Sequence, residues 1–115
     1  MKIKLVLAVV ASAVMGLAAG SAWAEEWKDV SIVDAHCAGK MKADADSHTR
    51  SCALQCAHYG YGLIGSDGKF VKFDTVGNAK IKAALQASDK ADHLRATVDG
   101  EQQGNTIKVT SVTLQ

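Results

Sequence analysis

Apolar and polar residues alternate along two segments near the C-terminus. The apolar members of this pattern are Leu94, Ala96, Val98, Ile107 and Val109. Side chains two residues apart share one face of a β-strand, so the pattern predicts a hairpin of two half-buried strands. The alternation shifts phase between Val109 and Val112. This shift predicts a bulge near Thr110–Ser111 or a strand that is covered on both faces.

Three more strands are predicted upstream. The segment EEWKDVSIVDAHC places Val30 and Ile32 among polar neighbours, which predicts a first strand running to about Cys37. Two short apolar runs then flank a Ser-Asp-Gly turn at residues 66–68. Because Asp and Gly accept the positive φ of tight turns, this pattern predicts a hairpin within residues 61–73.

One helix is predicted between the first strand and this hairpin. Asp46 or Ser47 can cap a helix over roughly Ser47–Tyr59, following a polar loop at residues 38–44. Gly60 can end the helix because glycine tolerates the left-handed backbone conformation.

A second, shorter helix is predicted between the two hairpins. Ile81 and Leu85 lie four residues apart, as on one face of an amphipathic helix. Thr75 or Asn78 would cap its first turn.

The order of these elements predicts the fold class. Five strands with a helix between the third and fourth is the order of the OB-fold, a small, partly open barrel. We therefore predict a mainly β (α+β) domain, a small five-stranded OB-like barrel with a helix inserted after strand one and a second short helix between strands three and four. The alternative is an α+β sandwich whose helices cover one face of an open sheet.

The N-terminus has the pattern of a signal peptide. Lys2 and Lys4 precede an apolar run over Leu5–Ala19, and Ala22-Trp23-Ala24 is a small-x-small cleavage site. We predict a signal peptide at residues 1–24, a single OB-like domain at 25–115, and a periplasmic or secreted protein after cleavage near Ala24. The run is shorter than the roughly 20 residues that span a bilayer, so no stable membrane anchor is expected after cleavage.

Charge argues against a nucleic-acid partner. The chain has 13 basic and 12 acidic residues, and removal of Lys2 and Lys4 leaves 11 against 12, a net charge of −1. The basic residues are scattered, whereas a nucleic-acid binder needs a positive stripe. The small ligand, metal or protein that the domain binds is left open.

The segment SHTRSCALQCAHYGYG carries the candidate chemistry. On the predicted helix, His48, Cys52 and Cys56 lie four residues apart and would share one face. Together with Cys37 they would form a Cys3His set, which binds zinc, and thiolates also bind copper(I), with Met41 and His36 as extra copper ligands. The predicted metal ligands are Cys37, His48, Cys52 and Cys56, with zinc or copper as the candidate metals.

A disulfide from Cys37 to Cys52 or Cys56 is the alternative. Cβ atoms four residues apart on a helix are about 5 to 6 Å apart, too far for Cys52 to bridge Cys56. A bridge to Cys37 would close a loop of about fifteen to twenty residues, worth on the order of 3 kcal/mol. An oxidising compartment favours this cross-link, which leaves one spare thiol.

No catalytic pattern stands out, so we predict a protein that is not an enzyme. The chain has no Cys-x-x-Cys pair, and Cys52 lies inside the predicted helix rather than in its first turn, where backbone amides would lower its pKa. His58 falls on a different helix face from Cys56, and His93 is predicted to lie on the surface.

The chain resembles a group of short exported bacterial domains. The shared pattern is an early cysteine, then His-x3-Cys-x3-Cys-x3-Gly, an Asp-Gly hairpin and two Val/Thr-rich strands, and here it consists of Cys37, His48, Cys52, Cys56, Gly60, Asp67, Gly68, LRATVDG and NTIKVTSVTL. The resemblance implies an OB-like fold and singles out the four site residues, but the group has no established activity. Similar sequences often place a proline after the glycine, where this chain has Tyr61.

These patterns predict the class of function. We expect an exported small binding module whose Cys/His cluster binds zinc or copper. The alternative is a disulfide-stapled periplasmic domain with a structural or ligand-binding role and no metal.

Overall fold

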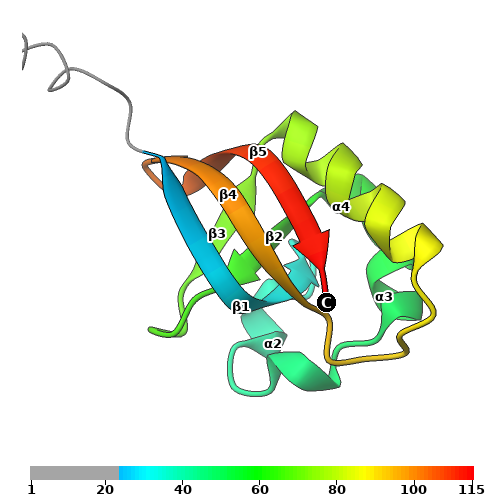
Figure 1. Cartoon of the computed structure of the whole chain (residues 1–115). Helices are drawn as coiled ribbons and strands as arrows, with labels where there is room; N and C mark the ends of the chain where they lie inside the picture. The colour runs from blue at the N-terminus through cyan, green and yellow to red at the C-terminus, as the bar shows by residue number, and fades with distance from the viewer. Residues whose placement is uncertain (1–23) are drawn as a thin grey trace, which may run out of the picture.

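The computed structural model of the chain describes residues 24–115. Five strands close into a barrel in the order β1-β2-β3-β5-β4 (Figure 1). They are β1 (Glu25–Asp34), β2 (Tyr61–Ile64), β3 (Phe70–Phe73), β4 (Arg95–Gln103) and β5 (Thr106–Leu114). Neighbouring strands are antiparallel except β3 and β5, which pair in parallel. The predicted small five-stranded OB-like barrel is confirmed, and the open-sheet alternative is wrong because β1 pairs with β4.

Three α-helices and two 3-10 turns connect the strands of the described chain. They are α2 (Ala38–Met41), η1 (Ala45–Ser47), α3 (Arg50–Gln55), η2 (Ala57–Tyr59) and α4 (Thr75–Ala87). The predicted helix between strands three and four is α4, which lies against β5. Its N-cap is Asp74 rather than Thr75 or Asn78, because the Asp74 carboxylate accepts the N–H of Gly77.

The predicted helix over Ser47–Tyr59 is wrong in its first part. Thr49 is the N-cap of α3, since its backbone is extended and its hydroxyl accepts the N–H of Cys52. His48 is likewise extended and lies outside the helix. The helix is followed by η2 and then by Gly60, whose φ of 86° is positive as predicted, but whose ψ of 176° is not that of the left-handed helical conformation.

The segment before η1 also differs from prediction. The first strand ends at Asp34, three residues before Cys37, because the chain turns there and Cys37 becomes the N-cap of α2. Residues 38–41, predicted as part of a loop, form α2, which is a single helical turn. Ala38 of this turn packs against Val33 and Ile64.

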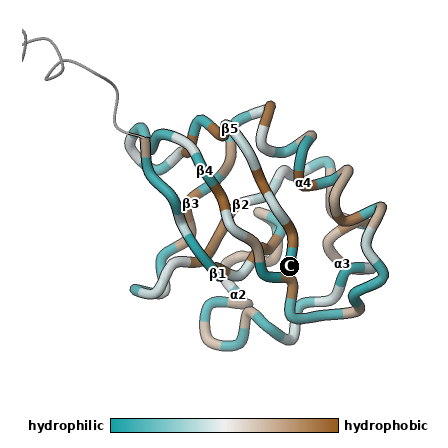
Figure 2. The backbone as a smooth tube through the Cα atoms, viewed as in Figure 1, coloured by the Kyte–Doolittle hydropathy of each residue, from teal (hydrophilic) through white to brown (hydrophobic). Residues whose placement is uncertain are grey.

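The barrel interior is filled by the alternating residues of the C-terminal hairpin. The buried residues are Leu94, which directly precedes β4, and Ala96, Val98, Ile107 and Val109 of the two strands. Figure 2 shows hydrophobic and polar positions following one another along β4 and β5. Asp99 pairs with Ser111 and Gly100 with Val109, so Thr110 is an extra residue, and the predicted bulge is confirmed.

A polar network fixes η1 to the barrel. The Arg95 guanidinium donates to both carboxylate oxygens of Asp46 at 3.0 Å, and the N–H of His93 donates to the Asp46 carbonyl at 3.0 Å. The hydrogen bonds with Arg95 lower the pKa of Asp46, and those with Asp46 raise the pKa of Arg95. A fixed η1 determines where the next residue, His48, lies.

The predicted signal peptide, residues 1–24, lies outside the described residues except for Ala24, so it stays a prediction. Within residues 24–115, no helix has the length and apolar character that crossing a membrane requires.

Candidate metal centre

Asp34 lies at the end of β1 with its carboxylate fully buried. The run of buried residues from Val30 to Val33 continues directly into it. Its Oδ2 accepts the N–H of Cys37 at 3.0 Å, and its Oδ1 lies 2.7 Å from Nε2 of His48. A buried carboxylate needs such partners because the charge has left water.

His48 reaches this carboxylate from the inserted segment. Its side chain is 3% exposed. In the chain, His48 lies between η1 and Thr49, the N-cap of α3. Arg95 holds η1 in place through Asp46, and Thr49 accepts the N–H of Cys52, so the backbone on both sides of His48 is fixed. The His48 ring is therefore positioned by tertiary contacts rather than by a helix.

Cys37 brings a thiol to the same place. One donor atom each from Asp34, Cys37 and His48 lies within 4.8 Å of the other two. Burial raises the pKa of the Cys37 thiol, and the negative charge and acceptor oxygen of Asp34 raise it further. This direction is the opposite of the lowered pKa that activates a cysteine nucleophile.

The structure brings together two of the four predicted ligands. Cys37 and His48 join Asp34, whereas Cys52 is exposed on α3 and lies outside the group. Cys56 follows α3 and is partly buried, near enough to Cys37 for its charge to raise the Cys37 pKa. The ligand roles of Cys52 and Cys56 stay predictions.

The predicted stripe of His48, Cys52 and Cys56 on one helix face is wrong for His48. The helix begins at Arg50, and His48 turns toward β1 instead. Cys52 and Cys56 do lie one turn apart, since the N–H of Cys56 donates to the Cys52 carbonyl.

All three cysteines lie in the described part of the chain, and each is a free thiol there. The predicted alternative of a disulfide from Cys37 to Cys52 or Cys56 is therefore not what this structure contains.

The remaining sequence candidates lie outside the group. His36 stacks on the exposed Tyr59 with ring centroids 4.5 Å apart, and Met41 packs in the apolar cluster beneath α2. The His58 ring also lies close to Tyr59, with ring centroids 4.1 Å apart and the ring planes tilted by 37°. His93 is exposed as predicted, and its ring is 2.8 Å from Asp92, whose hydrogen bond raises the pKa of His93.

Asp34 is the residue that sequence reasoning missed. Its place directly after an apolar strand and three residues before Cys37 is a weak signal, because strand-end carboxylates are ordinarily exposed. Carboxylate, thiolate and imidazole are all zinc ligands, and the carboxylate makes the set harder than an all-thiolate one.

Comparison of the chain with protein-family models, with curated proteins and with solved structures found no match. The chemistry of the group therefore carries the functional argument.

Proposed function

We propose that the protein is an exported small metal-binding module in which Asp34, Cys37 and His48 hold one zinc ion. The observation that carries this proposal is the convergence of three different donor atoms within 4.8 Å at a buried position. A tetrahedral zinc site places nitrogen and oxygen ligands about 3.3 Å apart, given bond lengths of about 2.0 to 2.2 Å. The 2.7 Å contact of His48 with Asp34 would need to open by only about 0.6 Å.

The donor set favours zinc over copper(I). Copper(I) prefers soft thiolate and thioether ligands, and here a carboxylate and an imidazole accompany a single thiol. Copper remains the second candidate metal, and Cys56 is the nearest additional thiol that could make the set softer.

Metal binding would release protons. Zinc binds the thiolate, and the Cys37 thiol has a raised pKa, so at neutral pH its proton must leave on binding. Nε2 of His48 and Oδ1 of Asp34, which now lie 2.7 Å apart, would both turn a lone pair to the ion. Proton release is therefore a signature of this site.

The test is a titration of the reduced, chelator-treated protein with Zn(II), Cu(I) and Co(II). We expect one Zn(II) per chain, a thiolate-to-metal charge-transfer band with Co(II), and heats of Zn(II) binding that vary with the ionisation enthalpy of the buffer. Cys37→Ser and His48→Ala should each remove stoichiometric binding. His93→Ala, which changes an exposed histidine, is the control and should bind as the unaltered protein does.

Cys52→Ser separates the two ligand sets. If it binds Zn(II) normally, Cys52 is not a ligand, as the set of Asp34, Cys37 and His48 requires, whereas loss of binding would support the four-residue set predicted from sequence. Unchanged binding by both Cys37→Ser and His48→Ala would contradict a metal function at this site.

The second candidate function is a disulfide-stapled domain, and one observation favours Cys56 as the partner of Cys37. The chain leaving β1 runs antiparallel to the chain entering β2: the N–H of Ala35 donates to the Gly60 carbonyl at 2.8 Å, and the His36 ring stacks on Tyr59. This arrangement holds the two cysteine segments side by side.

Intact mass after denaturing alkylation without reductant distinguishes this candidate. One alkylated cysteine would support the staple, and peptide mapping should then find Cys52 as the alkylated thiol. Three alkylated cysteines, with a metal-sized mass difference in the native spectrum, would support the metal module instead.

A further inference from the structure

Cys37 takes part in both states considered for this site. Its thiol is one of the three donor groups that converge within 4.8 Å, and its segment lies beside the segment that carries Cys56. Zinc binds a cysteine as the thiolate, and a sulfur atom that has formed a disulfide has no thiolate charge to offer. A metal ion and a disulfide therefore exclude each other at Cys37.

The path of the chain into β2 holds Cys56 near Cys37. The N–H of Ala35, two residues before Cys37, donates to the Gly60 carbonyl at 2.8 Å. The N–H of Tyr59 donates to the Cys56 carbonyl at 3.0 Å, which closes the turn η2. Burial is the main cause of the raised pKa of the Cys37 thiol, and the charge of Cys56 adds to it, so the two side chains lie within electrostatic range of each other.

Both thiols lie where the backbone can adjust. Cys37 is the N-cap of α2, which has four residues, and Cys56 is the C-cap of α3, which has six. Helices this short are marginal without tertiary support, and their end residues lack the full set of intrahelical hydrogen bonds. Cys52 lies inside α3 and is exposed. A bond from Cys37 to Cys56 thus needs less rearrangement than a bond from Cys37 to Cys52.

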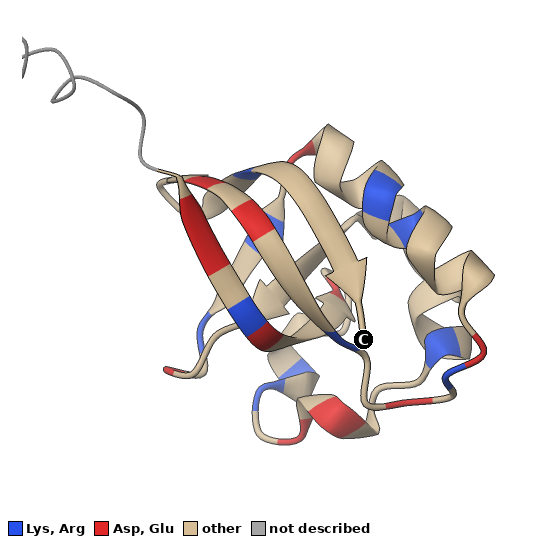
Figure 3. Cartoon of the chain, viewed as in Figure 1, with Lys and Arg blue, Asp and Glu red and all other residues tan. Residues whose placement is uncertain are grey.

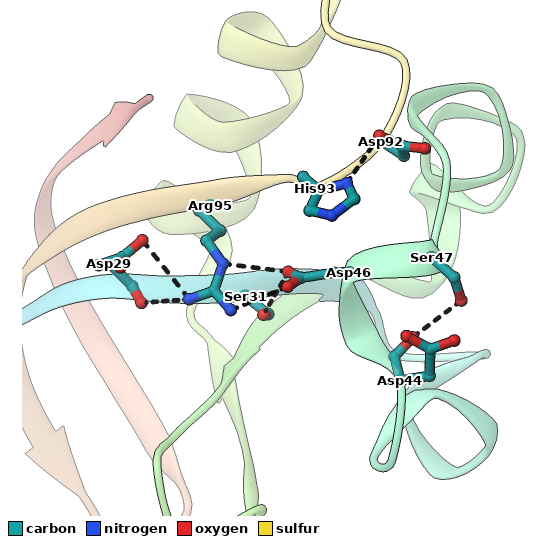
Figure 4. A network of polar contacts seen from close by, with 8 residues as sticks. All are labelled: Asp29, Ser31, Asp44, Asp46, Ser47, Asp92, His93 and Arg95. Atoms are coloured by element: carbon teal, nitrogen blue, oxygen red, sulfur yellow. Dashed lines mark hydrogen bonds and ion pairs between the residues drawn. The ribbon is translucent and has the colours of Figure 1, made fainter.

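His48 is held in place without help from either thiol. Figure 4 shows the Arg95 guanidinium between Asp29 and Asp46. Arg95 donates to Asp46 through Nε and Nη2 at 3.0 Å, and to the Asp29 carbonyl through Nη1 at 2.8 Å. None of these bonds involves a cysteine, so η1 and the following His48 keep their place when the chemistry at sulfur changes.

Neither state leaves the buried Asp34 carboxylate without a partner. A zinc ion with ionised Asp34 and Cys37 forms a group of no net charge, and in the disulfide state the contacts of Asp34 with His48 at 2.7 Å and with the Cys37 N–H at 3.0 Å remain. The segments that carry the two cysteines, residues 35–39 and 51–66, include no acidic or basic residue, and β2 is tan throughout in Figure 3. No other charge therefore has to move when one state replaces the other.

We propose that Cys37 and Cys56 form a reversible disulfide that switches the metal site, so that the protein binds zinc only when both thiols are reduced. This inference rests on the proposed metal function. The oxidant is a low-molecular-weight disulfide, RSSR. One protein thiolate attacks it and displaces the first thiolate RS⁻, and the second protein thiolate then displaces the other RS⁻ and closes the protein disulfide. Overall, the two protein thiols lose two electrons and two protons, and RSSR takes them up to give two RSH.

The first test compares zinc binding by the reduced and oxidised forms of the unaltered protein. Oxidised glutathione is the oxidant, and it is removed before calorimetric titration with Zn(II). We expect one Zn(II) per chain in the reduced form, no stoichiometric binding in the oxidised form, and full recovery after treatment with a phosphine reductant. Alkylation and peptide mapping of the oxidised form should find Cys52 as the modified cysteine.

The second test measures protection of the thiols by zinc. With free Zn(II) at about ten times its dissociation constant, about a tenth of the sites stay free, so oxidised glutathione should form the disulfide about tenfold more slowly. Quenching with an alkylating reagent, followed by intact mass, measures the rate. Mg(II), a hard cation that prefers oxygen ligands, is the control and should leave the rate unchanged.

Two variants localise the switch. Cys56→Ser should keep its zinc binding after treatment with oxidised glutathione, because Cys37 has lost its partner. Cys52→Ser is the matched control and should lose zinc binding on oxidation, as the unaltered protein does. The two tests on the unaltered protein stand even if a variant folds poorly.

Failure of the switch can be told apart from failure of the metal function. A reduced protein that binds no Zn(II) would contradict both. If the reduced protein does bind Zn(II), the switch alone is contradicted by any of three results: the oxidised form binds Zn(II) equally well, the oxidant leaves all three thiols free, or Cys56→Ser loses its zinc binding on oxidation as the unaltered protein does.

Discussion

Nε2 of His48 lies 2.7 Å from Oδ1 of Asp34, although 14 residues separate them in the chain. Both side chains are buried, at 3% and 0% exposure. The pair joins the segment between β1 and β2 to the end of β1, and it supplies two of the three proposed metal ligands. The contact therefore has a role in stability and a role in metal binding, and separate experiments test the two.

Breaking the buried pair should be costly even without metal. His48→Ala leaves the Asp34 carboxylate buried without its partner, so we expect a loss of about 3 to 5 kcal/mol in the free energy of unfolding. Urea denaturation in the presence of a chelator measures it. The matched control is His93→Ala, since His93 and Asp92 are also 2.8 Å apart but exposed, and its effect should stay within about 1 kcal/mol.

The double variant Asp34→Asn/His48→Gln tests whether the two residues act together. We expect it to be more stable than the sum of the single losses predicts, with a coupling of roughly 0.5 to 3 kcal/mol. Strictly additive losses would mean that the 2.7 Å contact contributes nothing to folding.

Alkaline pH should destabilise the protein through Tyr61. Burial raises the pKa of this phenol from 10.0 to about 12, and the charges of Asp34 and Cys56 act in the same direction. Because the pKa in the folded state is raised, Tyr61 contributes stability that is fully present below pH 10 and is lost as the pH rises toward 12. The loss is at most about 1.4 kcal/mol per pH unit.

Urea denaturation of metal-free protein between pH 9 and 12 measures this loss, and Tyr61→Phe is the comparison. The variant loses the hydrogen bond from the phenol to the Ala53 carbonyl, about 1 kcal/mol, and should show a shallower alkaline decline. An equally steep decline in Tyr61→Phe would assign the effect to other groups.

Adding a methyl group at Gly77 should destabilise α4. Alanine in place of an interior helix glycine ordinarily gains about 1 kcal/mol. Here a Cβ would lie 2.5 Å from Cγ2 of Val109 and 2.9 Å from Cβ of Phe73, so we expect Gly77→Ala to cost about 1 to 3 kcal/mol.

Gly39→Ala in α2 is the matched control for that substitution. No heavy atom lies within 4 Å of the Cβ position there, so the change should be neutral or stabilise by about 0.4 to 1 kcal/mol. Thermal melts of the two variants should therefore shift in opposite directions, and a stabilised Gly77→Ala would show that α4 can move away from β5.

Asp74 should matter beyond its role as a helix cap. Its Oδ1 accepts the N–H of Gly77 at 2.9 Å and the N–H of Val109 at 3.2 Å, which links α4 to β5. Asp74→Ala removes both bonds, so we expect a loss of about 1 to 3 kcal/mol. Asp67→Ala is the control, because it removes only the exposed hydrogen bond from the Lys69 N–H to the Asp67 carboxylate, and it should lower the free energy of unfolding by less. Equal losses in the two variants would mean that Asp74 acts only as an ordinary helix cap.

The candidate site was only partly readable from the sequence. Cys37 and His48 stood out because thiols and imidazoles are uncommon and reactive, whatever backbone carries them. The helical spacing that joined His48 to Cys52 and Cys56 was misleading, since Thr49 caps the helix and leaves His48 extended. Helix starts are set by single side-chain hydrogen bonds, and several residues in this segment could have supplied one.

The sequence by itself determined the order and type of the strands. The period of two from Leu94 to Val109 fixed which residues face the barrel interior, because a strand with one buried face leaves its register little freedom. The phase shift after Val109 likewise predicted the bulge at Thr110. Local pattern suffices for such features because neighbouring residues alone set the direction of each side chain.

Only the tertiary structure decided the site. Asp34 is an ordinary strand-end carboxylate in the sequence, and it becomes a candidate ligand only where barrel closure buries it and the Arg95 and Asp46 pair brings His48 to it. Contacts between residues far apart in the chain arise from packing the whole barrel, which no local pattern encodes.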